Sequence, residues 1–173
     1  MYFNTGQMNL AKNAFRNAEQ ITGHYFRLKP DKMTSYLYDV KTLAYLENHE
    51  VKDGAFAHLC KYHYQKEEAH RAGSFHFYRI CLQDNRILDA VERSHSFIKL
   101  TPLMLYIAAH ELVHIIRFDA GEIEFDAPLE DKEQEEQRVH AITRDMLQAG
   151  MDSDLKIVVD CFSDRYKIGD FCN

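Results

Sequence analysis

Residues 101–116 form the segment that most constrains the fold of this chain. The segment opens with Thr-Pro, a good helix start, because a proline in the first turn lacks only an N–H that would have no helical partner there. The residues that follow are almost all apolar, so the helix is expected to be buried on most sides. Charged or imidazole side chains occur in it only at His110, Glu111 and His114. The rest of the chain is therefore expected to pack around this helix.

These three polar residues belong to the motif H-E-L-V-H at positions 110–114. On a helix, His110 and His114 point from one face and can bind a single metal ion between them. Glu111 looks into the same cleft and adds a proton acceptor to the metal ligands. Without a metal, several buried polar groups would lack partners, which is costly. The motif therefore predicts a zinc site with Glu111 as the general base.

A third ligand is expected from a second, downstream helix, since a catalytic zinc usually takes three protein ligands and leaves one position for water. That helix begins with acidic residues at 133–136 and continues to Leu147. Glu136 lies at the polar start of the inward face, on the same stripe as His140. Glu135 borders the core face as well and is the alternative ligand. His140, one turn after Glu136, is placed to brace the ligand or to bind the metal itself.

The two patterns together resemble a known family. His110-Glu111-x-x-His114 followed by Glu136-x-x-Val139-His140 is similar to the gluzincin branch of the zincin metallopeptidases, over roughly residues 94–147. The resemblance implies that His110, His114 and Glu136 bind one Zn²⁺ ion and that Glu111 is the general base. Members of this class commonly carry Asp or Asn one turn after the third ligand, where this chain has His140.

The remaining pattern predicts further helices and a small sheet. Apolar spacing favours helices over residues 7–28, ending before Pro30, and over residues 32–68 with a break near Asp53-Gly54. Residues 75–82 and 86–91 favour strands of a hairpin that turns at Asp84-Asn85. Residues 96–100 are expected to form a short strand that leads into the metal helix, and an extended peptide can add to such a strand.

The expected fold is an α+β protein of minimal zincin type. It has a helical N-terminal part, a small and mainly antiparallel sheet, the metal helix and the third-ligand helix. The length of 173 residues, a hydrophobic fraction of 46% and the lack of a linker predict one domain over residues 1–173.

Charge and hydropathy limit the partners. A net charge of −6 without any basic block argues against nucleic acid or an anionic membrane as the main partner. No apolar run approaches a membrane span, and the first residues lack the pattern of a signal peptide. We expect a cytoplasmic protein.

The other histidines and the cysteines lack the paired spacing of metal ligands. The histidines in the first half are expected to lie at the surface or rim: His58, His63, His70 and His76. The cysteines are expected to be idle thiols in a reducing compartment: Cys60, Cys81, Cys161 and Cys172. An alternative for Cys172 is that it folds back as an inhibitory zinc thiolate.

The expected function is zinc-dependent hydrolysis of a peptide or protein substrate, or of a related amide. The transition state also needs a donor for its oxyanion, and the candidates are Arg117, Arg144, His140 and Tyr166. Two alternatives remain open: a catalytically silent metal-binding or regulatory module, and a zinc hydrolase of a non-peptide substrate. Two histidines and one carboxylate also suit iron or manganese.

Overall fold

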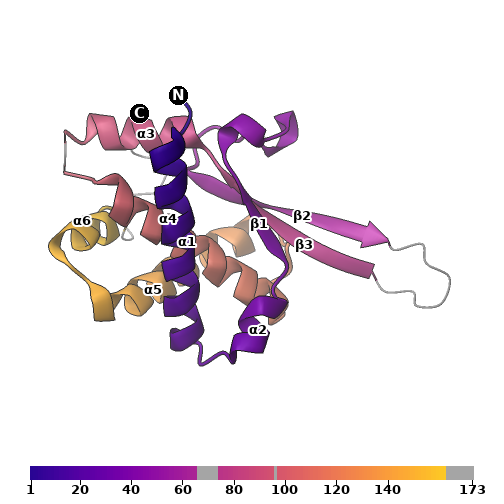
Figure 1. The fold of residues 1–173 in the computed structure, drawn as a ribbon. Coiled ribbons are helices and arrows are strands. Elements are labelled where there is room, and N and C mark those ends of the chain that lie inside the picture. Colours follow the sequence, from indigo (N-terminus) through magenta and orange to yellow (C-terminus); the bar gives the residue numbers. More distant parts are fainter. Residues whose placement is uncertain (66–73, 96, 163–173) are drawn as a thin grey trace.

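A computed structural model of the chain describes residues 1–65, 74–95 and 97–162 (Figure 1). These ranges form a mixed α+β structure. The helices are α1 (Thr5–Tyr25), α2 (Pro30–Ser35), α3 (Asp84–Arg93), α4 (Leu100–Asp119), α5 (Leu129–Leu147) and α6 (Ser153–Cys161). The strands are β1 (Tyr38–Lys41), β2 (Ala57–Gln65) and β3 (Ser74–Leu82), and the short 3₁₀ turns are η1 (Leu43–Tyr45), η2 (Asn48–Glu50) and η3 (Gln148–Gly150).

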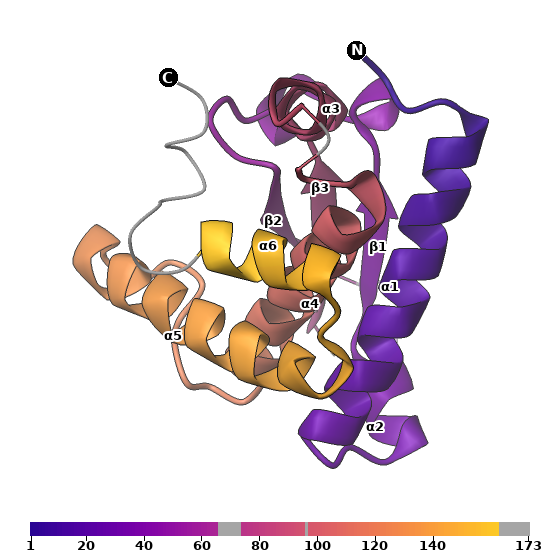
Figure 2. The same cartoon turned by 90° about the vertical axis from the view of Figure 1, so that its left-hand side faces the viewer.

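The helix α4 is the centre of the fold, as its apolar sequence predicts. Every residue from Tyr106 to Ile116 is buried. The helix α1 packs along α4 through small side chains, Ala11, Ala14 and Ala18, which allow the two backbones to approach closely. Figure 2 shows α5 and α6 on the same side of the sheet as α4. The predicted helices over residues 7–28 and up to Leu147 are confirmed, with their ends shifted by a few residues.

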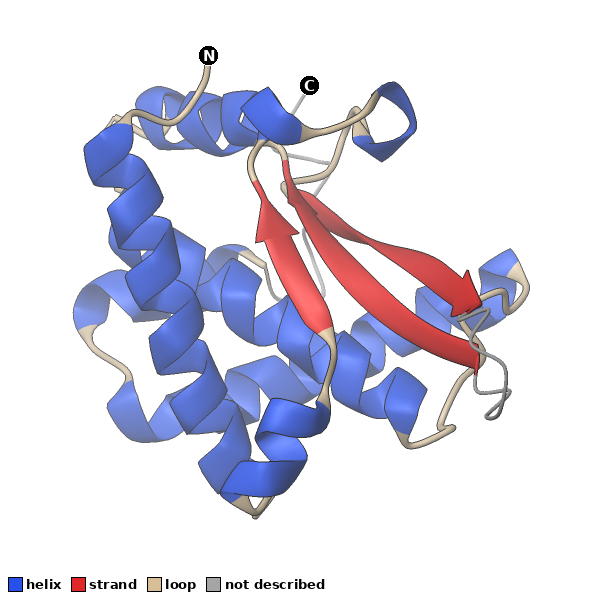
Figure 3. Ribbon diagram, turned by 45° about the vertical axis from the view of Figure 1, so that its right-hand side comes forward, coloured by secondary structure: helices blue, strands red, loops and turns tan. Residues whose placement is uncertain are grey.

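The three strands lie side by side in one sheet in the order β1-β3-β2 (Figure 3). β1 runs parallel to β3, and β2 runs antiparallel to it. Alternate residues of β3 face opposite sides. Tyr78 and Leu82 are buried on the side of the helices, where Tyr78 stacks on Phe118 of α4 with ring centroids 5.9 Å apart. Arg79 and Cys81 lie on the opposite face.

The predicted helix over residues 32–68 is wrong. Only α2 is helical in its first part, and β1, η1, η2 and β2 occupy the rest up to residue 65, while residues 66–68 lie outside the described residues. Apolar spacing there fitted a helix, but β2 pairs along its whole length with β3. This pairing joins residues that are 9 to 25 positions apart, beyond the reach of helical spacing, and such tertiary contacts override local preference.

The predicted hairpin is also wrong in its second half. Residues 84–93 form α3 instead of a turn and a strand. Asp84 is fully buried, and its carboxylate accepts hydrogen bonds from the backbone amides of Phe3 at 2.9 Å and Leu43 at 3.0 Å. Asp84, the first residue of α3, therefore connects this helix to the segments around Phe3 and Leu43. The antiparallel partner of β3 is therefore β2, which precedes it in the sequence, and not the predicted strand over residues 86–91.

The expected strand at residues 96–100 does not form. Residues 97–99 are a bend and a loop, Leu100 begins α4, and residue 96 lies outside the described residues. In the part of the chain that the structure describes, no helix combines the length and the apolar composition needed to cross a membrane.

Candidate metal centre

Two histidines of α4 meet at the buried surface of this helix. Their spacing of four residues places His110 and His114 on one face, and their Nε2 atoms lie 3.1 Å apart. Both side chains are nearly inaccessible, with relative exposures of 4% and 7%. The structure therefore brings the predicted pair together, with the Nε2 atom of one imidazole next to the Nε2 atom of the other.

Glu136 of α5 completes the group. Its Oε2 lies 3.2 Å from His110 Nε2, and its Oε1 lies 3.2 Å from His114 Nε2. Because the side chain of Glu136 is 51% exposed, the group is open to solvent on the side of α5. Helix periodicity accounts for this position, since Glu136 begins the face of α5 that continues through buried Val139 and Thr143.

The spacing of these atoms fits a metal ion better than a set of hydrogen bonds. Each imidazole nitrogen carries at most one proton, so hydrogen bonds cannot satisfy all three contacts at once. Bonds of about 2.0–2.2 Å from zinc to nitrogen or oxygen, at tetrahedral angles, place two ligand atoms about 3.3 Å apart. The observed separations of 3.1, 3.2 and 3.2 Å are close to this value, with each imidazole facing a different oxygen of the Glu136 carboxylate. The three side chains therefore offer donor atoms at separations that a zinc ion would fit.

The electrostatics of the group follow from burial and mutual contact. Burial lowers the pKa of His110 to about 4, against the opposing hydrogen bond to Glu136. Burial also acts to lower the pKa of His114, but Glu136 and then Glu111 raise it above the usual value. For Glu136, burial acts to raise the pKa, and the hydrogen bonds from both histidines hold it well below its usual range. Glu136 is therefore an anion in contact with two imidazoles.

Glu111 lies in the same buried region. Its relative exposure is 7%, and burial raises its pKa to about 7, with His114 opposing this and Glu136 adding to it. The carboxyl is therefore buried within electrostatic range of both residues.

The Nδ1 atoms of His110 and His114 are buried and have no hydrogen-bond partner among the described residues. In metal sites this nitrogen usually donates to a carboxylate or carbonyl, which fixes the ring. Aromatic packing holds the rings here instead. His110 stacks on Tyr106 at 6.1 Å, and His114 stacks on Phe118 at 5.9 Å between ring centroids. All four residues recur at four-residue spacing on α4, a pattern that could have identified Tyr106 and Phe118 from the sequence.

Glu135, the alternative ligand, faces elsewhere. It is buried, and its carboxylate pairs with Arg117 through contacts of 2.5 Å to Nε and 3.0 Å to Nη2. The Arg117 guanidinium is thus occupied by an ion pair. A solvated acidic helix start describes Glu133 but not Glu135.

His140 lies against His110, with ring centroids 4.7 Å apart. Its Nδ1 is 2.5 Å from the hydroxyl of Tyr106. Ligand atoms of His110, Glu136 and His140 all lie within 4.8 Å of one another. The structure therefore places His140 beside His110 and Glu136, and the Tyr106 hydroxyl contacts the His140 ring.

The remaining sequence candidates are dispersed. Arg144 is exposed on α5, and Tyr166 and Cys172 lie outside the described residues. Among the other histidines, His63 and His76 are exposed, His70 lies outside the described residues, and His58 is partly buried.

Comparison with known proteins gave no relative: no family model, curated protein or solved structure matches this chain. The chemistry of the site is therefore inferred from its own residues.

Proposed function

We propose that this protein is a zinc-dependent hydrolase of peptides or related amides, with His110, His114 and Glu136 as the metal ligands. The observation that carries the proposal is the convergence of His110 Nε2, His114 Nε2 and the two carboxylate oxygens of Glu136, whose three contacts of 3.1–3.2 Å hydrogen bonds cannot all satisfy. Half-exposed Glu136 leaves one side of the group open to a substrate.

Glu111 supports an enzyme rather than a structural metal site. A structural site needs no proton acceptor, and burying a carboxyl group without a function is costly. A zinc ion in this position would polarise a carbonyl and lower the pKa of water. Glu111 would accept the proton of the attacking water and return it to the leaving amine.

His140 is the candidate donor to the oxyanion of the transition state. It lies 4.7 Å from His110 between ring centroids, and the bond to Tyr106 orients its imidazole. Arg117 is a weaker candidate because Glu135 holds its guanidinium.

The edge strand β2 is the proposed site for the substrate backbone. It contacts α4 and, among the described strands, pairs only with β3. Its outer edge therefore offers backbone groups to which an extended peptide can add. This edge replaces residues 96–100, where the sequence suggested it.

The test of this function is the substitution Glu111→Gln, which keeps size and hydrogen bonding and removes the proton acceptor. Wild-type protein is loaded with Zn²⁺ and screened on mixed fluorogenic peptides and amides, and the variant is assayed on the substrate found. We expect a loss of at least about 100-fold in kcat with unchanged metal content and circular dichroism. Glu133→Gln, the same change at an exposed position of α5, is the matched control.

Two results would contradict the proposal. Equal rates for wild type and Glu111→Gln would exclude the general-base role. Tight metal binding without cleavage of any peptide or amide would favour the silent metal-binding module instead.

A further inference from the structure

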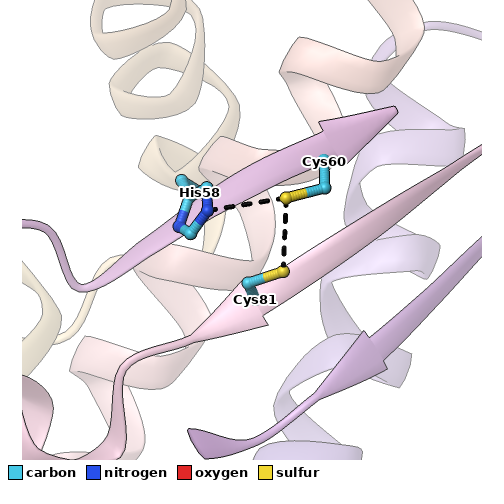
Figure 4. Close-up of side chains that lie close together, drawn as sticks. All are labelled: His58, Cys60 and Cys81. Atoms are coloured by element: carbon cyan, nitrogen blue, oxygen red, sulfur yellow. Dashed lines mark hydrogen bonds between the residues drawn. The ribbon is translucent and has the colours of Figure 1, made fainter. Parts of the chain in front are cut away.

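A second group of metal-ligating side chains lies on the sheet, away from α4. It consists of His58 and Cys60 on β2 and Cys81 on β3 (Figure 4). His58 and Cys60 are two residues apart on a strand and therefore share one face. In the register of the sheet, Cys81 lies opposite His58. Pairing between the strands thus assembles a group that sequence spacing within either strand does not reveal.

Two distances in this group match those of a zinc site. Cys60 Sγ is 3.6 Å from His58 Nε2 and 3.8 Å from Cys81 Sγ, and all three ligand atoms lie within 4.8 Å of one another. Zinc–sulfur bonds of about 2.3 Å and zinc–nitrogen bonds of about 2.0–2.1 Å, at tetrahedral angles, give about 3.8 Å between two sulfurs and about 3.6 Å between sulfur and nitrogen. Both short separations therefore agree with one tetrahedral ion.

A disulfide explains the arrangement less well. Cys60 pairs in register with Arg79, so it is diagonal to Cys81 rather than directly opposite it. The two sulfurs are 3.8 Å apart, whereas a disulfide bond is about 2.05 Å long. A disulfide would also leave His58 without a role, although its imidazole contacts Cys60.

Burial acts differently on the imidazole and on the two thiols of this group. Burial and then Lys52 lower the pKa of His58, so its imidazole is neutral and able to coordinate at pH 7. Burial raises the pKa of both thiols, so each holds its proton until an ion displaces it. The nearby Glu50 carboxylate already accepts hydrogen bonds from Arg79 and Tyr62 and is not counted among the ligands.

We propose that His58, Cys60 and Cys81 bind a thiophilic metal ion, with Zn²⁺ as the expected ion and Cu(I) as the other ion of the same ligand preference. Binding releases the two thiol protons to solvent and forms two metal–sulfur bonds and one metal–nitrogen bond. The ion would join the edge strand β2 to the central strand β3. This site is independent of the one on α4 and α5 and holds whether or not the chain is a hydrolase.

The experiment uses Co²⁺ as a spectroscopic probe of thiolate ligation. The full-length chain is reduced, freed of metal and titrated with Co²⁺, and the near-ultraviolet absorption is recorded. A thiolate bound to Co²⁺ gives a charge-transfer band there, which the histidine and carboxylate ligands of the other site do not give. We expect this band in wild type and in His110→Ala, and its loss in Cys60→Ser and Cys81→Ser. The double variant Cys161→Ser/Cys172→Ser is the matched control and should keep the band.

Zn²⁺ competition then measures affinity, and Cu(I) titration identifies the preferred ion. Removing one ligand should weaken Zn²⁺ binding at least about 100-fold, because even changes beside a metal ligand cost 10–100-fold. Circular dichroism checks that each variant is folded. If Cys60→Ser does not fold, protection of Cys60 and Cys81 from alkylation by Zn²⁺ in wild type gives the same information. The proposal is overturned by a band that requires Cys172, by the absence of a band in wild type, or by a Cys60–Cys81 disulfide that forms while no metal binds.

Discussion

Two neighbouring glutamates of α5 should respond to substitution in opposite ways. Glu135 is buried, with its side chain 4% exposed, and forms a two-contact ion pair with Arg117. Glu136 is half exposed and contacts both histidines of the candidate metal centre. The same change, Glu to Gln, therefore tests stability at one position and metal binding at the next.

For Glu135→Gln, the Arg117 guanidinium loses its charged partner in a buried position. Removing one member of a buried ion pair lowers the free energy of unfolding by about 3–5 kcal/mol. Glutamine keeps an amide oxygen that can accept from Arg117, so we expect a loss of about 3 kcal/mol. In a chain of 173 residues, 1 kcal/mol shifts Tm by about 2–4 °C, so the expected fall in Tm is about 6–12 °C. Zinc affinity should stay within a few-fold of wild type.

For Glu136→Gln, the metal-free protein should keep most of its stability. The increase in the free energy of unfolding on adding zinc should largely disappear. Zinc at 100 times its Kd raises the free energy of unfolding of wild type by about 2.7 kcal/mol. If loss of a ligand weakens affinity about 100-fold, the same concentration adds only about 0.4 kcal/mol.

The assay is thermal unfolding with and without Zn²⁺, followed by circular dichroism, in a Cys60→Ser background that removes the second proposed site. Loss of the zinc-induced shift in Glu135→Gln together with its retention in Glu136→Gln would refute the ligand assignment. A stability loss of equal size in both variants without zinc would refute the distinction in burial.

Three further predictions concern the surroundings of the site and the fold. His140→Gln should lower kcat by about 100–1000-fold with metal content unchanged, since an oxyanion donor acts only in the transition state; loss of metal, measured by elemental analysis, would make His140 a ligand instead. Burial acts to raise the pKa of Glu50, but hydrogen bonds from Tyr62, a backbone amide and Arg79 lower it to about 2 from its usual value of 4.5. The Glu50 carboxylate therefore contributes stability above pH 4.5 that is lost as the pH falls toward 2, so urea unfolding should show Glu50→Gln less stable than wild type by about 3 kcal/mol at pH 7 and by less than half of that at pH 3. Asp84→Ala should cost about 3 kcal/mol in the same assay, because two backbone amides lose a charged acceptor at 2.9 and 3.0 Å, and an unchanged unfolding midpoint would contradict this role.

The sequence alone determined the features that depend on spacing within one helix. The burial of α4 follows from its apolar run, and the shared face of His110 and His114 follows from the four-residue repeat. The same periodicity favoured Glu136 over Glu135 as the residue directed to the histidines, and the structure brings Glu136 there. Neighbours along a helix fix these positions, so no distant contact was needed to predict them.

The tertiary structure decided whatever depends on which distant segments meet. Spacing predicted a helix over residues 32–68 and a turn and strand over residues 84–91. Both predictions were wrong, because the pairing of β2 with β3 and the packing of α3 decide these segments. The ion pair of Glu135 with Arg117 and the contact of His140 with Tyr106 depend on how α5 packs on α4. The group of His58, Cys60 and Cys81 exists only through the register of two strands. A one-residue slip in that register would turn Cys81 to the other face of the sheet, which is why no pattern within either strand could reveal the group.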